Sequence, residues 1–340
     1  MSRLGLLLPD WAASLEEELI RRSIFSTAAI EGNPLQEEEV GRIIEQKHSE
    51  AKHDEAKQAI INLIKVYNYI KTIKPIVEHY RLTEKFIKDV HKIITLNLLN
   101  PDNTPGNYRD HIVKVGDREH GGIYTPPKCR VDIENLMKEF IEWINSEEVM
   151  QLDRFIRAAL AHYHLGLIHP FGNGNGRTIR IIEAMLLRVS GIKYVPTMLS
   201  NYYYRQIDDY YIAFSQTQKN REEDMTEFIK FALKGVIESL KEIKGRITSN
   251  IRLLVTRDYL HFLREKKRIT QRQFDLIYIL MGDGGFNPIS LKDLFNKSPY
   301  NTLYRHVSER TARRDIAKLL ELNILTHEND HYILDIHALG

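Results

Sequence analysis

The chain has 340 residues, of which 43% are hydrophobic and 28% are charged, and its formal net charge is +2. A charge so close to zero gives no global electrostatic reason to expect nucleic-acid binding, and no apolar run approaches the roughly 18 residues of a membrane span. The single cysteine, Cys129, excludes an internal disulfide framework and predicts a cytoplasmic protein.

The first predicted element is an amphipathic helix over residues 10–24, where apolar side chains recur at helical spacing among acidic ones. Glu31, Gly32 and Pro34 indicate a helix C-terminus, since glycine caps a helix and proline prevents its continuation. This interpretation leaves Glu31 unexplained, because the helix dipole disfavours an acidic residue in a last turn.

Residues 35–46, 54–71 and 83–98 carry three further helical patterns and predict a helical bundle, with Thr83 as an N-cap. His91 lies among apolar neighbours in the third pattern. We therefore expect a core histidine there rather than a ligand.

The pattern changes after this bundle. Residues 105–109 indicate a turn, residues 111–115 alternate like a strand, and residues 121–127 are rich in glycine and proline. This stretch predicts a hairpin, and a helical pattern resumes over residues 131–144.

Residues 169–180 form the most informative stretch, a loop with three glycines between two apolar helical patterns. Glycine lets the backbone approach a ligand closely, and N–H groups at a helix start bind anions with the helix dipole behind them. Arg177 and Arg180 are three residues apart and lie on one face of the second helix's first turn. His169, at the start of the loop, suits proton transfer near neutrality. The stretch therefore predicts a phosphate site with its own base.

An aromatic cluster follows, consisting of Tyr202, Tyr203, Tyr204, Tyr210 and Tyr211. Aromatic faces can hold an adenine ring, and a packing stripe explains such a cluster equally well, so both interpretations stay open. Residues 225–243 then predict a long helix that completes the bundle.

The last part of the chain has a different character. Residues 244–272 hold nine basic and two acidic side chains, which indicates a basic helical connector. Residues 289–294 open a short helix, Ser308 caps a second one, and residues 323–325 and 331–334 indicate a two-stranded wing. This order resembles a winged helix-turn-helix.

Arg310, Arg313 and Arg314 in the second of these helices are candidate DNA contacts. Residues 291–340, however, hold seven basic and seven acidic side chains. A dimerisation or target-docking module is therefore an equal alternative.

The loop from His169 to Arg180 resembles the signature of the Fic family, H-x-F-x-[D/E]-G-N-[G/K]-R-x-x-R, and differs only where Asn173 replaces Asp or Glu. The resemblance implies a mainly α fold, a Fic-type helical bundle with a β-hairpin flap. It also implies an enzyme that transfers AMP from ATP to a protein hydroxyl and releases pyrophosphate. In this enzyme His169 would take the proton of the hydroxyl, and Phe171 would support the loop from beneath.

The resemblance further implies the contacts with ATP. Asn175 and the amides of Gly174 and Gly176 would contact the α-phosphate, and Arg177 and Arg180 would hold the β- and γ-phosphates. Asn201 with Tyr210 or Tyr211 would line the rest of the pocket. The predicted ATP site consists of Gly172, Asn173, Gly174, Asn175, Gly176, Arg177, Arg180, Asn201, Tyr210 and Tyr211.

Asn173 also bears on the metal that the family uses. The family's acidic side chain holds a magnesium ion between two phosphates, and a hard cation prefers a carboxylate to a neutral amide. We therefore expect weak binding of Mg²⁺ or Mn²⁺ at Asn173, mainly through the phosphates, and slower transfer.

Thr27-x-x-x-Glu31-Gly32 resembles the family's inhibitory motif, [ST]-x-x-x-E-[GN], in its N-terminal position. The resemblance implies that Glu31 pairs with Arg180 in place of the γ-phosphate and so inhibits the enzyme. It also implies that the hairpin docks the target protein by strand pairing. The flap residues expected to do so are Ile112, Val113, Lys114, Ile123 and Tyr124.

The predicted domains are an N-terminal region with the inhibitory helix (1–50), a catalytic core (51–243), the basic connector (244–285) and a small winged-helix domain (286–340). The predicted function is a protein adenylyltransferase that Glu31 inhibits, acting on itself and on a target that the sequence does not identify. Two alternatives stay open: an enzyme that removes AMP or transfers another phosphate-containing group, and a nucleotide-sensing regulator weakened at Asn173. Homo-oligomer formation is also left open.

Overall fold

The computed structural model describes residues 4–46, 54–75, 80–102, 104–220, 224–282 and 288–335. The chain divides into two compact units, Met1–Lys241 and Glu242–Gly340, and each is described by itself. The predicted domain boundaries after residues 50 and 285 lie outside the described residues. The predicted boundary after residue 243 falls within helix α11 (Thr226–Glu265), as does the division between the two units.

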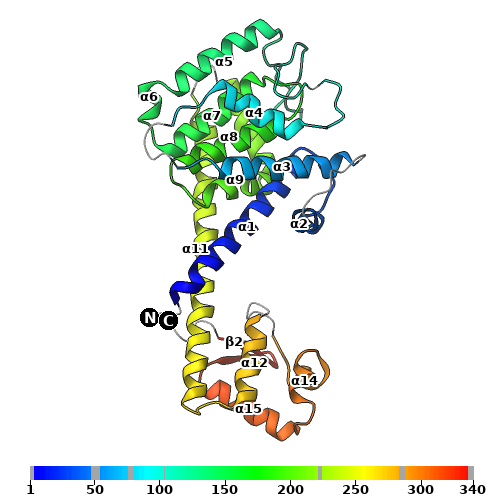
Figure 1. The fold of residues 1–340 in the computed structure, drawn as a ribbon, viewed down its shortest axis with the longest axis vertical. Helices are drawn as coiled ribbons and strands as arrows, with labels where there is room; N and C mark the ends of the chain where they lie inside the picture. The colour runs from blue at the N-terminus through cyan, green and yellow to red at the C-terminus, as the bar shows by residue number, and fades with distance from the viewer. Residues whose placement is uncertain are drawn as a thin grey trace. The chain divides into compact units, whose positions relative to one another are not determined.

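The first unit is built from helices (Figure 1). Helices α7 and α8 pack against each other, α8 also contacts α4 and α9, and α1 packs along α9. The elements are α1 (Leu4–Ile30), α2 (Glu37–Glu45), α3 (Glu55–Lys71), α4 (Glu84–Thr95), α5 (Arg130–Ile144), α6 (Glu147–Met150), α7 (Arg154–Ile168), α8 (Asn175–Val189), α9 (Val195–Arg205), α10 (Ile207–Lys219) and the start of α11.

Apolar side chains from several of these helices form the core of the first unit. They include Leu19, Ile60, Leu63, Ile87, Ile181, Ile182, Met185 and Met198, all fully buried. Helix α8 is buried along nearly its whole length, and the buried residues include the charged Arg177, Arg180 and Glu183.

Short side chains define the starts of two helices. Asp54 caps α3 by accepting a hydrogen bond from the N–H of Lys57 at 3.0 Å. Thr83 caps α4 by accepting from the N–H of Phe86 at 3.2 Å, which confirms the predicted cap.

The end of α1 is fixed by a glycine cap. The helix ends at Ile30, and Gly32 adopts a φ of 80°, a conformation that L side chains rarely adopt. The N–H of Asn33 reaches back to the carbonyl of Ala28 at 3.1 Å. Glu31 therefore lies at the tip of α1, between the last helical residue and its cap.

Residues 111–124, called the flap below, occupy the place of the predicted hairpin. Val115 and Tyr124 form one isolated bridge, with N–H to O distances of 2.9 and 2.8 Å. The predicted strand over residues 111–115 is wrong, because in the described flap only Val115 meets a partner on the opposite arm.

The second unit continues from α11 and contains a small sheet. Its further elements are α12 (Gln271–Gly282), α13 (Asp293–Asn296), α14 (Tyr300–Tyr304), α15 (Glu309–Glu321), β1 (Leu325–Glu328) and β2 (His331–Leu334). The two strands pair antiparallel, with Leu325 opposite Leu334. Ser308 caps α15, as predicted, by accepting from the N–H of Thr311 at 3.3 Å.

The predicted basic connector is part of this second unit. Leu260, Leu263, Phe274 and Leu276 are buried in one core cluster with Leu319 of α15. The description as a connector is therefore incomplete, because these apolar residues recur at helical spacing between the charged ones and pack into a core. Among the described helices, none has the length and apolar character needed to cross a membrane.

Candidate active site

The predicted phosphate loop joins α7 to α8. His169 follows the last residue of α7 with a left-handed backbone (φ 47°), and its N–H donates to the carbonyl of Leu165 at 2.9 Å. Such a backbone is uncommon for a residue other than glycine and marks a constrained position. At the other end, Gly174 (φ 76°) precedes the first residue of α8, Asn175. The loop thus places the imidazole beside the start of a helix.

The side chain of Asn175 braces the loop from within. Its Oδ1 accepts from the N–H of Phe171 at 2.9 Å, and its Nδ2 donates to the carbonyl of Phe171 at 2.7 Å. This buried amide thus uses its oxygen and one of its two N–H donors to hold the loop, and the backbone N–H of Asn175 is also available for contact with a phosphate.

Phe171 lies beneath the loop, as expected, and is supported by His91. The two rings stack with centroids 3.7 Å apart and planes inclined by 3°. Nδ1 of His91 accepts from the N–H of Gly106 at 3.0 Å, so Nε2 carries the proton and donates to the carbonyl of Asn173 at 2.9 Å. His91 is fully buried, which confirms the predicted core histidine, and it also holds the loop in place.

Arg109 fixes the first part of the loop and was not recognised from the sequence. Its guanidinium, which is buried, donates to three carbonyls: His169 at 2.9 Å, His111 at 2.7 Å and Pro127 at 2.7 Å. Its backbone N–H donates to the carbonyl of Pro170 at 3.0 Å. One side chain therefore ties His111, at the start of the flap, and Pro127, three residues beyond its end, to the loop.

Two glycines are required by close contacts. A Cβ on Gly172 would lie 1.9 Å from the carbonyl oxygen of Asp102, and one on Gly176 would lie 2.2 Å from Oε1 of Glu31. Any side chain at Gly172 would push against backbone, and one at Gly176 would displace the Glu31 carboxylate.

The first turn of α8 supplies the anion donors. The N–H groups of Asn175, Gly176 and Arg177 have no carbonyl partner within the helix and point along the positive end of its dipole. The N–H of Gly174, which was expected to contact a phosphate, instead donates to Oδ1 of Asn173 at 2.5 Å.

Glu31 and Arg180 form the ion pair that the resemblance implied. Nη2 of Arg180 lies 2.7 Å from Oε1 of Glu31, and it also donates to the carbonyl of Thr27 at 3.1 Å. Arg180 is 1% exposed and Glu31 is 28% exposed. Burial alone would raise the pKa of Glu31, but Arg180 and then Arg177 outweigh it, so the carboxyl has a pKa below its usual value.

Arg177 lies on the other side of this ion pair. It is buried, and its Nη2 donates to Oδ1 of Asn173 at 3.1 Å. It lines a second cavity of about 410 Å³, shared with Glu31, Asn173 and Glu55, and does not line the main cavity. The two arginines thus line different cavities, while both act on the carboxylate of Glu31.

The main cavity, of about 540 Å³, collects most of the predicted site. The flap and α10 contribute further walls, including Ile123, Tyr124, Ser215 and Lys219. The predicted residues that line it are Glu31, His169, Gly172, Asn173, Gly174, Asn175, Gly176, Arg180, Tyr210 and Tyr211.

Asn201 does not line this cavity. Its Oδ1 accepts from Oγ of Ser26 at 3.2 Å, because α9 packs along α1. The geometry does not support the predicted contact with the nucleotide.

The flap residues differ in exposure. Ile112 and Ile123 are 60% and 54% exposed, an unusual state for isoleucine, and Lys114 is also exposed. Val113 is half-buried, and the hydroxyl of Tyr124 donates to the carbonyl of Leu167 at 3.2 Å. Apolar side chains are thus available on the flap for contact with another chain.

A buried polar network below the cavity holds Tyr210. The Tyr210 hydroxyl lies 2.9 Å from Nε2 of His162, Nδ1 of His162 lies 2.9 Å from Glu183, and the hydroxyl of Tyr203 donates to Glu183 at 2.8 Å. These side chains come from α7, α8, α9 and α10, so no local pattern in the sequence could have joined them.

His169 has the properties of a neutral base. The residue is half-buried, and burial lowers the pKa of its imidazole to about 4, although the nearby Glu31 carboxylate acts in the opposite direction. A hydrogen bond with the backbone of Gly166 also acts to raise the pKa. The ring is therefore uncharged at neutral pH and able to accept a proton.

The donors at the predicted metal position are few. The amide oxygen of Asn173 already accepts from Gly174 and Arg177, and it is neutral. Within the described parts of the chain, no three His, Cys, Asp or Glu side chains are grouped to hold a metal ion. These residues do not build a metal centre by themselves, so a divalent ion would depend on ligands that the nucleotide brings.

Comparison with known proteins agrees with this geometry. Residues 81–187 match the model of the Fic/DOC family. The protein adenylyltransferase fic-1 of Caenorhabditis briggsae is 25% identical over 255 residues, which cover 73% of this chain and 46% of that protein. The protein adenylyltransferase Fic of Drosophila ananassae is 30% identical over 217 residues, covering 64% of this chain and 40% of that protein. The chain thus spans less than half the length of these relatives.

Solved structures share the mainly helical fold. A Fic family protein from Desulfovibrio desulfuricans has a TM-score of 0.59 at 20% identity, over 97% of this chain and 90% of that chain. A fragment of Fic-1 from C. elegans has a TM-score of 0.52 at 19% identity, over 73% of this chain and 76% of that chain. Residues 81–187 are thus similar to the Fic/DOC family, and this matched segment includes the whole loop from His169 to Arg180.

Proposed function

We propose that the protein is an adenylyltransferase, which transfers AMP from ATP to a hydroxyl side chain of a protein. The observation that carries this proposal is the arrangement of the main cavity. A neutral imidazole, His169, lies at its wall beside the N–H groups that open α8 and the guanidinium of Arg180. A base next to a site for several phosphate oxygens suits transfer of a nucleotidyl group to a protic acceptor.

The proposed reaction forms one bond and breaks one. The target hydroxyl oxygen attacks the α-phosphorus of ATP, its proton passes to His169, and the bond to the β-phosphate oxygen breaks to release pyrophosphate. His169 has a low pKa while buried, and phosphates in the cavity would raise that pKa, as Glu31 does now. Bound ATP would thus strengthen the base that its own reaction requires.

The protein's other contribution is fixed positive charge. The N–H groups at the start of α8 are held by the braced loop, so they need little rearrangement as negative charge develops on the phosphates. Arg180 would then bind the γ-phosphate in place of the Glu31 carboxylate. A divalent ion, Mg²⁺ or Mn²⁺, would arrive with ATP and neutralise phosphate charge, with Asn173 as its weak protein ligand.

Glu31 is the proposed brake. Its carboxylate is held by Arg180 at 2.7 Å and lies directly against Gly176, in the first turn of α8. A carboxylate and a phosphate both form strong charge-assisted bonds with a guanidinium, so only one can occupy this place. ATP binds productively when Glu31 has moved away.

The test uses α-labelled ATP with Mg²⁺ or Mn²⁺ and four purified proteins: the wild type, Glu31→Gly, Glu31→Gly with His169→Ala, and Glu55→Gln. Glu55 lines the second cavity only, so its variant controls for loss of a nearby acidic charge. We expect label on the Glu31→Gly protein alone. Absence of label from all four, with ATP binding still measurable by calorimetry, would refute the transfer reaction.

The substitution Asn173→Asp separates this proposal from a regulator weakened at Asn173. A working transferase should change mainly in its metal dependence, whereas a silenced site should gain transfer activity. The measurement is the rate of labelling over a titration of Mg²⁺, in the Glu31→Gly background. A large gain in rate at saturating Mg²⁺ would favour the regulator.

A further inference from the structure

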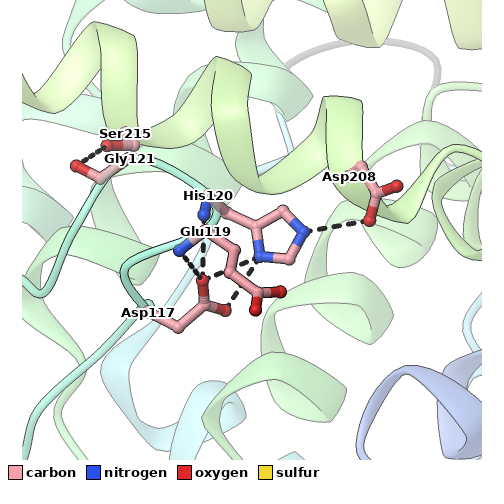
Figure 2. A network of polar contacts seen from close by, with 6 residues as sticks. All are labelled: Asp117, Glu119, His120, Gly121, Asp208 and Ser215. Carbon is pink, nitrogen blue, oxygen red and sulfur yellow. Dashed lines mark hydrogen bonds and ion pairs between the residues drawn. The ribbon is translucent and has the colours of Figure 1, made fainter.

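The tip of the flap rests on α10 through side chains from both elements (Figure 2). Nε2 of His120 lies 2.9 Å from Oδ1 of Asp208, and the His120 ring meets the edge of Tyr211 with centroids 5.4 Å apart. These contacts join residues 88 positions or more apart in sequence. They hold the flap tip independently of the single bridge between its arms.

Asp117 shapes the turn that presents His120. Both of its carboxylate oxygens lie 2.9 Å from Nδ1 of His120, and Oδ1 also accepts from the backbone N–H groups of Glu119 and His120 (Figure 2). The carbonyl of Asp117 accepts from the N–H of Gly122 at 2.6 Å. The imidazole is therefore held between two carboxylates, one from the flap and one from α10.

Gly121 completes the contact with α10. Its carbonyl accepts from Oγ of Ser215 at 3.2 Å and from the ammonium of Lys219. Its φ is 101°, and a Cβ at this position would lie 2.4 Å from Oγ of Ser215. The turn thus fits closely against the helix, and no larger residue can replace the glycine without a shift.

The same contact surface forms a wall of the main cavity. Asp117, His120 and Gly121 from the flap line it, and so do Tyr211 and Lys219 from α10. A nucleotide that fills the cavity therefore touches the elements that hold the flap. A target protein that docks on the flap would touch the same elements from outside.

We propose that His120 is a positioning residue, which fixes the flap on α10 and thereby couples nucleotide binding to docking of the target protein. This inference rests on the proposed function for the identity of the two ligands. The charged and titratable groups that contact His120 are Asp117 of the flap and Asp208 and Tyr211 of α10, and the ammonium of Lys219 is bonded to the carbonyl of the neighbouring Gly121. Most of the charge around the ring is negative, which favours the imidazolium.

The contact of His120 with Asp208, called the latch below, depends on pH. Hydrogen bonds to Asp117 and then Asp208 raise the pKa of His120 above 6.5. Below the raised pKa both ring nitrogens carry protons, and each can donate to its carboxylate. As the pH rises through that value, one nitrogen loses its proton and one carboxylate loses its donor. The flap should therefore be held at lower pH and released as the pH rises above 6.5.

Amide hydrogen exchange measures the latch without any catalysis. The N–H groups of Val115 and Tyr124 are reporters, because each is bonded to the other residue's carbonyl across the flap. We expect Asp208→Asn to speed their exchange two- to fivefold, as suits an exposed ion pair. Asp209→Asn, the matched control from the next residue of α10, should leave the exchange unchanged. Equal protection in wild type and Asp208→Asn would overturn the latch.

Two further measurements test the coupling. After correction for intrinsic rates, exchange in the wild type should rise between pH 6 and 8.5, and Asp208→Asn should remove this rise. Saturating ATP should slow exchange in the wild type more than in Asp208→Asn, because coupling is reciprocal. An equal effect of ATP on the two proteins would overturn the coupling.

An activity assay tests the docking of the target protein independently. In the Glu31→Gly background, the acceptor is a copy of the chain carrying His169→Ala, and Asp208→Asn should raise the KM for this acceptor two- to fivefold with kcat little changed. An unchanged KM would contradict the role in docking. If no label is transferred while exchange still responds to ATP and to Asp208→Asn, the transfer proposal fails and the latch stands.

Discussion

Replacing Glu31 by glycine should destabilise the first unit without ATP and increase its response to ATP. Breaking a buried ion pair costs about 3–5 kcal/mol, and breaking an exposed one costs about 0–1 kcal/mol. Arg180 is 1% exposed but Glu31 is 28% exposed, so an intermediate loss of about 2 kcal/mol is expected. For a unit of this size, Met1–Lys241, that corresponds to a fall in Tm of about 4–8 °C.

The assay is thermal unfolding of both proteins with and without ATP, followed by circular dichroism. ATP at about 100 times its Kd adds about 2.7 kcal/mol, because it binds the folded state alone. In the wild type, part of that binding energy is used to displace Glu31 from Arg180. ATP should therefore raise the Tm of Glu31→Gly more than that of the wild type.

The matched control is the ion pair between Glu16 and Arg188, which also joins α1 to α8, at 3.2 Å, but lines neither cavity. Glu16→Gln should lower the Tm slightly and leave the response to ATP unchanged. If Glu31→Gly melts at the same temperature as the wild type, the ion pair does not stabilise the first unit. If ATP raises the Tm of Glu31→Gly and Glu16→Gln equally, Glu31 does not compete with ATP.

Three other predictions concern separate parts of the chain. Arg109→Lys should lower stability by about 2 kcal/mol and reduce kcat, because lysine cannot serve three carbonyls at once; denaturant unfolding and label transfer measure the two effects. The pKa of His169 is lowered from 6.5 to about 4, so between these values the unfolded chain binds more protons than the folded one, and stability decreases as the pH is lowered. His169→Asn should remove about 2 kcal/mol of the loss that the wild type shows at pH 4.5. Denaturant unfolding at pH 4.5 and at a pH above 6.5 measures this difference. Replacing Arg310, Arg313 and Arg314 by alanine should abolish retardation of duplex DNA at low salt; no retardation of the wild type would remove DNA as a partner.

Local signals explain how much of this fold could be predicted from the sequence. The starts of α3, α4 and α15 depend on Asp54, Thr83 and Ser308, each of which bonds an N–H three residues ahead. The phosphate loop was recognisable because its residues are contiguous, from His169 to Arg180. The ion pair between Glu31 and Arg180 was recognisable only through a resemblance, since the two residues lie 149 positions apart.

The residues that hold the site could not be found in this way. His91, Arg109 and Asp208 lie on separate elements and act on the loop or the flap only after folding. Helix α11 was predicted to end near residue 243, yet it continues to Glu265, because the charged residues beyond that point are interspersed with leucines that a core can bury. The prediction of a strand over residues 111–115 was wrong because alternation favours a strand only where a partner strand lies beside it.

The neutral side chain of Asn173 bears on the proposed role of Glu31 as well as on the proposed metal. Its amide oxygen accepts from Arg177 without neutralising it, whereas a carboxylate would do both. The loop therefore carries one more unit of positive charge than the family's pattern would give, at Arg177. This charge attracts the Glu31 carboxylate and phosphates alike, as the lowered pKa of Glu31 indicates. Under the proposed function, Asn173 would combine weak binding of a divalent ion with a firmer hold on the Glu31 carboxylate, and we expect release of Glu31 to be the more costly step.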